Sequence, residues 1–318
     1  MPAFAVSKTE FARDVREGLS RSGQRELDPQ YFYDDVGSAL FDAITLLPSY
    51  GLTRADTRLL QLHAEEIAAR LAGIPVVAEL GSGSGGKTRG ILSKLAAKNS
   101  IAYCPIDISE SALQKCAAGL RQMDSVTVVP IAATFLDGLH QAVRLRERNL
   151  PLAVLFLGST FGNFAPDAAE QFLSQVRHLL LPGDFLYLST DLEQETGRMI
   201  AAYDDPAGVT AAFNFNLLDR INRELQGSFV LSQFRHEARY NEREHRVEMH
   251  LRSLVSQRVT IGQDFAVELR EGETIRTECS YKFSCDGVAR LASRTGFTCE
   301  AQWTDSEWAF AQSLLRVT

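Results

Sequence analysis

Residues 76–88 restrict the fold of this chain more than any other stretch. Five mostly apolar residues, 76–80, run directly into a loop that holds four glycines in the six positions 81–86. A helix-compatible run, 87–97, follows without a linker. This succession predicts a buried parallel strand that turns tightly into a helix and exposes the first backbone N–H groups of that helix. Glycine is required in the loop because a Cβ would obstruct both the turn and the approach of a ligand.

Three binding motifs overlap in this loop. Gly81, Gly83 and Gly86 satisfy the GxGxxG pattern of dinucleotide-binding proteins, and residues 81–88 also satisfy the phosphate-loop pattern GxxxxGK[ST]. The sequence ELGSG at 79–83 matches the acidic-x-Gly-x-Gly turn of methyltransferases that use S-adenosylmethionine. The loop alone therefore leaves three classes open, namely an oxidoreductase, an NTPase and a methyltransferase.

The next expected strand, 101–106, narrows this choice because it ends at Asp107, 26 residues after Gly81. A carboxylate at the end of the second strand can accept both hydroxyl groups of an adenosine ribose. The dinucleotide-binding and methyltransferase classes predict such a carboxylate. An NTPase would instead need a magnesium-binding Asp after an apolar strand, a role that Asp191 could fill. The NTPase therefore stays as the weaker alternative.

Composition limits the partners and the compartment. The 318 residues carry a net charge of −7 with no basic block, which argues against a nucleic-acid partner and favours a small-molecule substrate. No apolar run approaches the roughly 20 residues of a membrane span, and the N-terminus has no signal-peptide core. Five cysteines without CxxC spacing are typical of reduced thiols, so we expect a cytoplasmic protein. No spacing suggests a metal site. His245 and His250 alternate with acids and are expected on the surface.

Strand and helix patterns alternate through the middle of the chain. Apolar strands are predicted at 76–80, 101–106, 126–132, 152–157 and 184–190. Alternation of this kind implies a parallel sheet with helices on both faces, in which ligands bind at the carboxyl ends of the strands. A closing strand pair, 297–303 and 308–317, is typical of methyltransferases.

The remaining segments predict a second domain. Long strands at 228–238, 246–261 and 274–283 cannot join the parallel sheet by simple alternation. The segment 30–41 packs four aromatic residues beside two acids, either as a buried arm or as a lid over a ligand. We therefore predict an α/β fold with two domains. A Rossmann-like class I methyltransferase domain with a C-terminal antiparallel hairpin would span 55–193 and 283–318. A smaller α+β substrate-binding domain would span 1–54 and 194–282.

Several longer motifs carry a family resemblance. FYDDVGSALFDAITLLPSY, ELGSGSGGKT, FLGSTFGNF, TDLEQETGRMIAAYDDPAGVTAAFNFNLL, RVEMHL and TECSYKF occur in this order from about residue 28 onward. Together they resemble the histidine-specific N-methyltransferases of ergothioneine biosynthesis. The resemblance implies transfer of three methyl groups from S-adenosyl-L-methionine to the α-amine of L-histidine, which gives hercynine. A methyltransferase for another amino acid or amine remains the alternative, and a nucleotide-binding oxidoreductase or an NTPase is more remote.

The resemblance also implies cofactor-binding residues. Gly81, Ser82 and Lys87 would bind the methionine part of the cofactor, and Asp107 its ribose. Tyr50 would lie near the transferred methyl group, and Phe135, with Thr134 beside it, would lie at the adenine. The family usually has Asp where this chain has Thr134, and a hydroxyl accepts a hydrogen bond more weakly than a carboxylate does.

On the substrate side, the resemblance implies three groups of contacts. Asn163 and Tyr203 would bind the histidine carboxylate, and Tyr33 would lie near the amine. As a separate hypothesis, Tyr33, or a water molecule bound to it, steers the proton that the amine must lose. The other residues implied are Glu278 and Ser280 on the imidazole, with Phe41, Thr210, Phe213 and Met249 shaping the pocket. Residues two apart on a strand point to the same face, so an acid and a hydroxyl at 278 and 280 can pair both ring nitrogens of a neutral imidazole. Leaving one nitrogen unpaired would cost roughly 1–3 kcal/mol, enough to discriminate against tryptophan. We expect a monomer.

Overall fold

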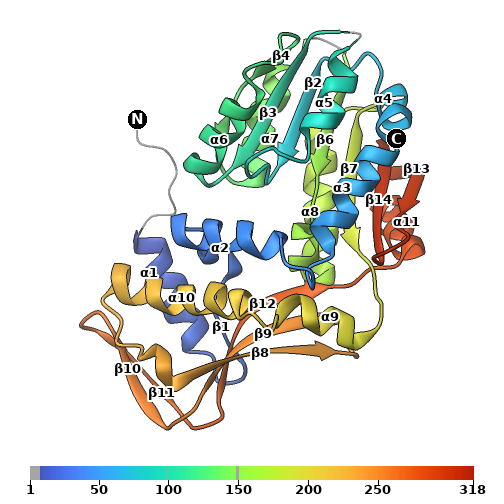
Figure 1. The fold of residues 1–318 in the computed structure, drawn as a ribbon. Helices are drawn as coiled ribbons and strands as arrows, with labels where there is room; N and C mark the ends of the chain where they lie inside the picture. Colours follow the sequence, from blue (N-terminus) through green and yellow to red (C-terminus); the bar gives the residue numbers. More distant parts are fainter. Residues whose placement is uncertain (1–7, 98, 148–149) are drawn as a thin grey trace. The chain divides into compact units, whose positions relative to one another are not determined.

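The computed structural model describes residues 8–97, 99–147 and 150–318. These residues form two compact units (Figure 1). The parallel-sheet unit comprises Leu52–Glu193 and Lys282–Thr318, and the insertion unit comprises the N-terminal segment up to Gly51 together with Gln194–Tyr281.

The parallel-sheet unit is built on one large mixed sheet. Its strands are β2 (Val76–Leu80), β3 (Ile101–Asp107), β4 (Val126–Val128), β5 (Ile131–Ala132), β6 (Leu152–Phe156), β7 (Phe185–Asp191), β13 (Phe297–Thr304) and β14 (Phe310–Val317). The order is β13-β14-β7-β6-β2-β3-β4, and β5 also pairs with β3. Strands β2 to β7 pair with one another in parallel, whereas β14 runs antiparallel to β7 and to β13. The predicted parallel sheet and its closing hairpin are confirmed.

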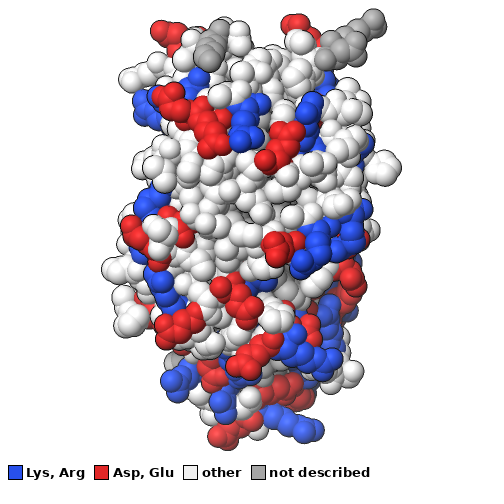
Figure 2. All heavy atoms as spheres, turned by 90° about the vertical axis from the view of Figure 1, so that its right-hand side faces the viewer, with Lys and Arg blue, Asp and Glu red and all other residues white. Residues whose placement is uncertain are grey.

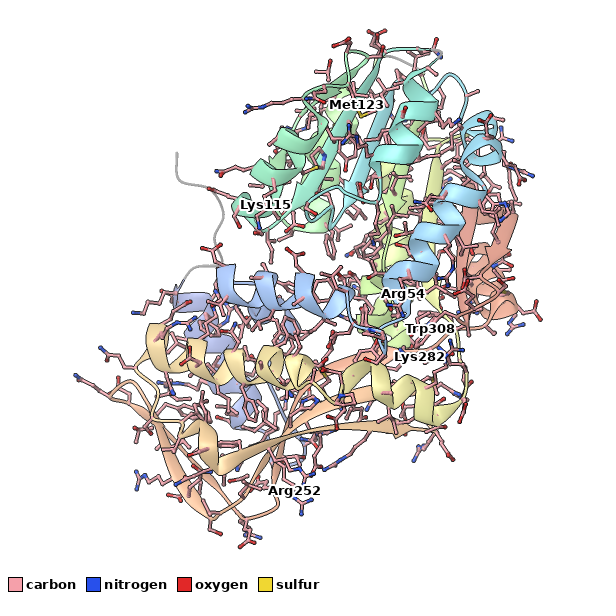
Figure 3. The ribbon with its side chains drawn as sticks, in the orientation of Figure 1. Arg54, Lys115, Met123, Arg252, Lys282 and Trp308 are labelled. Atoms are coloured by element: carbon pink, nitrogen blue, oxygen red, sulfur yellow. The ribbon has the colours of Figure 1, made fainter. Side chains whose placement is uncertain are left out.

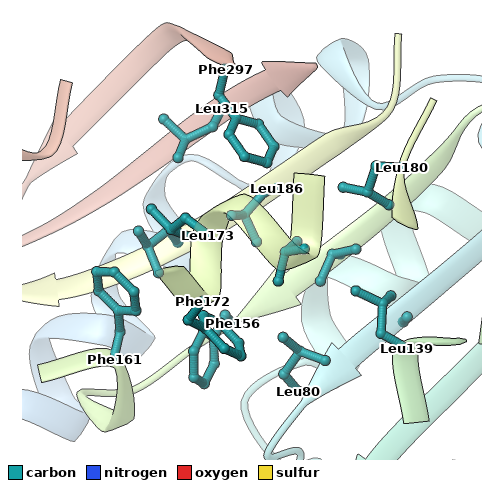
Figure 4. Close-up of a cluster of buried hydrophobic side chains, with 14 of the residues drawn as sticks. Leu80, Leu139, Phe156, Phe161, Phe172, Leu173, Leu180, Leu186, Phe297 and Leu315 are labelled. Carbon is teal, nitrogen blue, oxygen red and sulfur yellow. The ribbon is translucent and has the colours of Figure 1, made fainter. Parts of the chain in front are cut away.

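Helices cover both faces of this sheet. They are α3 (Leu52–Leu62), α4 (Ala64–Arg70), α5 (Arg89–Ala96), α6 (Glu110–Leu120), α7 (Phe135–Ala142), α8 (Pro166–Leu179) and α11 (Cys285–Arg294), with short 3₁₀ turns at η2 (Val143–Leu145) and η3 (Thr160–Asn163). Apolar side chains of α7, α8 and α11 join those of the sheet in one buried cluster that contains Phe156, Phe161 and Phe172 (Figure 4). All five residues of β2 and of β6 are buried, as expected for parallel strands covered on both sides.

Two elements of this unit are interrupted. The expected strand 126–132 is divided into β4 and β5, because Pro130 has no N–H group to continue the ladder. The helical segment that precedes β2 begins at Leu52 and is divided at His63 into α3 and α4. Neither change moves the carboxyl ends of the strands.

The insertion unit contains a four-stranded sheet with helices packed on it. Its strands are β1 (Arg25–Glu26), β8 (Phe234–Asn241), β9 (Arg246–Ser253), β10 (Gln257–Ile261), β11 (Phe265–Leu269) and β12 (Thr274–Tyr281). The sheet has the order β1-β12-β9-β8, and β10 pairs with β11 in a separate hairpin. The helices are α1 (Lys8–Leu19), α2 (Asp35–Thr45), α9 (Thr196–Tyr203) and α10 (Val209–Leu225), with 3₁₀ turns η1 (Pro29–Phe32) and η4 (Leu231–Gln233). Figure 1 shows α10 lying along the sheet, and it contacts both β8 and β9.

The prediction that His250 lies on the surface is wrong. Its side chain is 1% exposed on β9, and its Nε2 lies 2.9 Å from Oε2 of Glu248. Alternation along β9 places Val247 and Met249 on the other face, so both faces of this strand are buried. Glu248 is therefore the hydrogen-bond partner of the buried His250 ring, and its presence does not mean that this strand faces solvent. His245, in contrast, is exposed in the turn before β9.

Candidate active site

The glycine loop brings together residues from the carboxyl ends of three strands. Gly81, Gly83 and Gly85 have φ values of 66°, 53° and 70°, which favour glycine. A Cβ on Gly81 would lie 3.4 Å from the ring of Phe135, so this ring lies directly against the loop. Asp107, at the end of β3, accepts a hydrogen bond from the Gly83 N–H at 2.9 Å. The loop, an aromatic ring and a carboxylate therefore lie together at the carboxyl ends of the strands.

Asp107 is half-buried and anchored by the backbone. Its second oxygen accepts from the Ser109 N–H at 2.9 Å. Burial raises the pKa of Asp107, while the N–H groups of Ser109 and Gly83 oppose this effect. These bonds hold the carboxylate in one orientation at the end of β3.

Lys87 is paired with an acid that the sequence analysis missed. Its Nζ lies 2.8 Å from Oδ2 of Asp56, which is fully buried on α3. The Asp56 carboxylate also accepts from the Gly158 N–H at 2.9 Å and from Oγ of Ser189 at 2.7 Å. Burial alone would raise the pKa of Asp56, but Lys87 and the hydroxyl and amide donors around it outweigh this and lower it. The signal was present, because an acid at 56 lies between Leu52 and Leu60 on the apolar face of the helix.

Glu79 is a second buried acid beneath the loop. It is 2% exposed on β2 and accepts from Oγ1 of Thr88 at 2.6 Å and from the hydroxyl of Tyr103. Burial raises the pKa of Glu79 to about 7, although both hydroxyl donors and the charge of Lys87 act in the opposite direction. The acid of the ELGSG motif thus ties the strand to the start of α5, where Thr88 is the N-cap residue.

Three hydroxyl groups at this edge are buried without a hydrogen-bond partner in the described part of the chain. They are Oγ of Ser82, Oγ of Ser159 and Oγ1 of Thr190, which lie at the carboxyl ends of β2, β6 and β7. An unpaired buried hydroxyl costs roughly 1–3 kcal/mol, so such groups call for a polar ligand. Their position is the edge at which parallel sheets bind ligands.

The remaining predicted residues of this unit lie at the same edge. Thr134 is the N-cap of α7, where its exposed hydroxyl donates to Oδ2 of Asp137 at 2.7 Å. Asn163 ends the 3₁₀ turn η3, which follows β6, and is half-buried. Asp191, weighed as a magnesium ligand, instead forms a buried ion pair with Lys282 at 2.6 Å and accepts from Nε1 of Trp308 at 3.2 Å (Figure 3). Among the described residues, no group of three or more His, Cys, Asp or Glu side chains could hold a metal ion.

The insertion unit gathers the predicted aromatic residues into one connected cluster. The ring of Tyr33 lies 5.7 Å from that of Phe41 and 5.9 Å from that of Phe213. Phe41 in turn contacts Tyr50 at 6.3 Å, and Tyr50 contacts Tyr203 at 6.5 Å. Edge-to-face geometries at these distances are favourable and fix the rings relative to one another. Residue 50, expected beside the cofactor, thus belongs to the unit that holds the other rings.

The polar residues predicted for the substrate lie next to this cluster. The Tyr203 hydroxyl donates to Oγ of Ser280 at 2.7 Å, so α9 and β12 are joined at this point. Glu278 lies on β12 opposite Met249 and is half-buried. Thr210, in the first turn of α10, is 3% exposed. The predicted carboxylate-binding and ring-binding side chains of this unit are therefore close neighbours.

Comparisons with known proteins decide the family. A family model described as histidine-specific methyltransferase, SAM-dependent, matches residues 11–317. The chain belongs to this family. Histidine N-alpha-methyltransferase of Mycobacterium tuberculosis is 40% identical over 95% of this chain and 93% of its own length. Ergothioneine biosynthesis protein 1 of Neurospora crassa is 29% identical over 93% of this chain, which covers 33% of that longer protein.

Among solved structures, a Burkholderia thailandensis 1,6-didemethyltoxoflavin-N1-methyltransferase with bound S-adenosylhomocysteine is similar with a TM-score of 0.47. Its sequence is 14% identical, over 100% of this chain and 93% of that one. Family membership makes this chain a methyltransferase that uses S-adenosyl-L-methionine. The order of its sheet, with the antiparallel β14 beside β7, gives it the predicted Rossmann-like fold with a closing hairpin. Of the three classes left open by the loop, the methyltransferase is confirmed. Along the described parts of the chain, no helix is long and apolar enough to cross a membrane.

Proposed function

We propose that the protein transfers three methyl groups from S-adenosyl-L-methionine to the α-amine of L-histidine, giving hercynine, as the first step of ergothioneine biosynthesis. The observation that carries this proposal is the 40% identity to a histidine N-alpha-methyltransferase over 95% of the chain. The neighbouring positions of Glu278, Ser280 and Tyr203 on β12 and α9 support it, because an imidazole amino acid needs polar partners of this kind.

The residues of the parallel-sheet unit fit the cofactor. Gly81, Ser82 and Lys87 would hold its methionine part, with the Ser82 hydroxyl offering an unused hydrogen-bonding group. Asp107 would accept from the ribose hydroxyls, and Thr134 and Phe135 would bind the adenine. Tyr50 would lie near the transferred methyl group. When bound, the cofactor supplies a methyl group on a positively charged sulfur and carries the leaving group itself.

The residues proposed for the substrate divide by chemistry. Asn163 would donate to the carboxylate through its amide, and Tyr203 would do so by turning its O–H away from Ser280 toward the carboxylate. Glu278 would accept from the imidazole N–H, while the Ser280 hydroxyl would donate to the other ring nitrogen. The walls of the pocket would be formed by the remaining residues of the cluster, namely Phe41, Thr210, Phe213 and Met249. Because tryptophan has only one ring nitrogen, it would leave one of the two polar groups unpaired.

The proposed mechanism requires an uncharged amine. A lone pair on the α-amine must point at the methyl group, so the protein contributes mainly by positioning and by removing a proton before each attack. Tyr33, directly or through a water molecule, would steer this proton. The rings of Phe41 and Phe213, packed edge-on against Tyr33, limit the directions its hydroxyl can take.

The finer expectations about partners follow the same proposal. We propose a cytoplasmic, monomeric enzyme with a small-molecule substrate and no nucleic-acid partner. A net charge of −7 supports the absence of a nucleic-acid partner. On the face shown in Figure 2, acidic and basic side chains of the described residues are intermixed without a continuous basic patch.

Two experiments test the proposal. The protein is incubated with S-adenosyl-L-methionine and a mixture of amino acids, and the products are analysed by mass spectrometry. A gain of three methyl groups on histidine alone is expected, whereas methylation of tryptophan or another amino acid would refute the assignment. In the second experiment, Tyr33→Phe should slow turnover more than it weakens histidine binding, measured by calorimetry with S-adenosylhomocysteine present. An unchanged rate would remove Tyr33 from the mechanism.

A further inference from the structure

A buried amide beneath the predicted substrate residues connects four segments of the insertion unit. Asn214, on α10, has no exposed surface. Its Nδ2 lies 2.8 Å from Nδ1 of His236 on β8 and donates to the backbone carbonyl of His250 on β9 at 3.2 Å. Its Oδ1 accepts from Oγ1 of Thr277 on β12 at 2.7 Å. Every hydrogen-bonding position of this amide except one lone pair is therefore used.

The orientation of this amide sets the tautomer of His236. A backbone carbonyl only accepts, so the atom of Asn214 that faces it must be the NH₂ group. Nδ1 of His236 is then an acceptor, so the single N–H proton of the ring is on Nε2. This N–H group donates to the Tyr203 carbonyl at 2.8 Å. The ring is neutral, in keeping with burial, which lowers its pKa against the opposing charges of Asp204, Asp205 and Glu237. The backbone of Tyr203 is thus tied to Asn214 through one ring.

Thr277 occupies an irregularity in the pairing of β12 with β9. Arg276 lies opposite His250, and Glu278 lies opposite Met249, so Thr277 is an additional residue with no partner of its own. This arrangement is a β-bulge. The Thr277 hydroxyl, 1% exposed, bonds to Asn214 and also lies 3.2 Å from the Met249 carbonyl.

The bulge decides which face of the sheet carries the predicted ring-binding pair. Without the extra residue, Thr277 would lie opposite Met249, and Glu278 would lie opposite Glu248. A shift of one residue moves every later side chain to the other face. Glu278 would then face a second carboxylate, and Ser280 would lose the Tyr203 hydroxyl to which it is bonded in the structure.

We propose that Asn214 is a positioning residue that, through Thr277 and His236, places Glu278, Ser280 and Tyr203 for recognition of the substrate ring. This inference rests on the proposed function, because it assumes that Glu278 and Ser280 bind an imidazole. The Asn214 amide bonds to Thr277 in the bulge through its oxygen, and to the Tyr203 backbone through its nitrogen and the His236 ring. The two segments that contact the substrate are therefore kept in a single relative position.

The test compares Thr277→Val with Thr277→Ser. Valine keeps the shape but removes the hydroxyl, leaving Oδ1 of Asn214 without a donor, whereas serine keeps the hydrogen bond. We expect valine to lower kcat/KM for histidine by roughly tenfold, the effect of losing about one hydrogen bond, and serine to restore most of it. Affinity for S-adenosylhomocysteine, measured by calorimetry, should be unchanged in both. If the valine variant does not fold, Asn214→Asp replaces it, since aspartate still accepts from Thr277 but can donate neither to the His250 carbonyl nor to Nδ1 of His236.

A double-mutant cycle with Glu278→Gln separates positioning from a general loosening of the unit. If Thr277 acts through Glu278, the loss caused by valine should be much smaller when it is introduced together with Glu278→Gln. Equal losses with and without the glutamine substitution, or wild-type kcat/KM in the valine variant, would overturn the proposal. Wild-type protein that neither binds nor methylates histidine would instead refute the proposed function, and with it the ring-binding role of Glu278.

Discussion

Replacement of Glu79 by glutamine should change how the stability of the protein depends on pH. The Glu79 carboxyl is 2% exposed and accepts from the hydroxyl groups of Thr88 and Tyr103, and burial raises its pKa from 4.5 to about 7. An acid whose pKa is higher in the folded state stabilises the fold fully below its unfolded pKa. This contribution is lost as the pH rises through the folded value.

The magnitude follows from the two pKa values. Between pH 5.5 and pH 8.5 the unfolded carboxyl is already ionised, while the folded one changes from mostly protonated to mostly ionised. Integrating the difference in bound protons over this interval gives a loss of about 2 kcal/mol in the free energy of unfolding of the wild type. The side chain of the Glu79→Gln variant has no proton to lose, so this variant should not show the loss.

The assay is urea unfolding of wild type and Glu79→Gln at several pH values from 5.5 to 8.5. The difference between the two free energies of unfolding should shift by about 2 kcal/mol in favour of the glutamine variant as the pH rises. Glu65→Gln, at a side chain that is 84% accessible, controls for the loss of one charge. A difference that stays constant across the range would show that Glu79 is ionised in the folded protein at all these pH values.

Three further substitutions test the packing of a helix start, a buried ion pair and the binding of the cofactor. Gly37→Ala should lower the thermal midpoint strongly, because the new Cβ would overlap the backbone carbonyl of Phe32 in the preceding turn. Lys282→Met should cost about 3–5 kcal/mol of unfolding free energy, since it leaves the buried carboxylate of Asp191 without its cation. Asp56→Asn should weaken binding of S-adenosylhomocysteine about tenfold or more by calorimetry, because Lys87 loses the anion that orients it.

Each of these predictions has a control and a contrary result. Gly90→Ala, also in the first turn of a helix but with nothing within 4 Å of the new Cβ, should leave the midpoint unchanged or raise it. Asp191→Leu combined with Lys282→Met should recover part of the lost stability, and an additive loss would argue against the ion pair. Ser189→Ala removes one donor to Asp56 and should have a smaller effect than Asp56→Asn. Unchanged cofactor affinity in Asp56→Asn would show that Lys87 is oriented by other groups.

The parallel sheet could be predicted because its strands and turns depend on residues that are close together in sequence. The strand 76–80, its glycine loop and the following helix depend on local geometry, and β2 has the predicted bounds. Asp107 could be placed by the rule that parallel strands meet at one edge, without knowledge of any contact. The bounds of β4 and β5 show the limit of this reasoning, because Pro130 divides a run that is apolar except for Thr127.

Contacts between distant segments explain what could not be predicted. Asp56 pairs with Lys87, 31 residues away, and with Ser189, 133 residues away. Thr277, the extra residue of the bulge, donates its hydroxyl to Asn214, 63 residues earlier. A polar residue in an apolar pattern indicates that a partner exists, but not which one, because burial removes water as the default partner and only the fold supplies another.

The sequence by itself thus determined the parallel sheet with its closing hairpin, the glycine loop after the first strand, and the position of Asp107 at the end of the second strand. Only the tertiary structure decided how buried polar groups pair, which face of β12 carries Glu278 and Ser280, and that His250 lies inside. The physical reason is the distance along the chain over which each interaction acts. Backbone propensity and side-chain periodicity act over a few residues, whereas hydrogen bonding in the interior is settled by whichever segments the folded chain brings within about 3 Å.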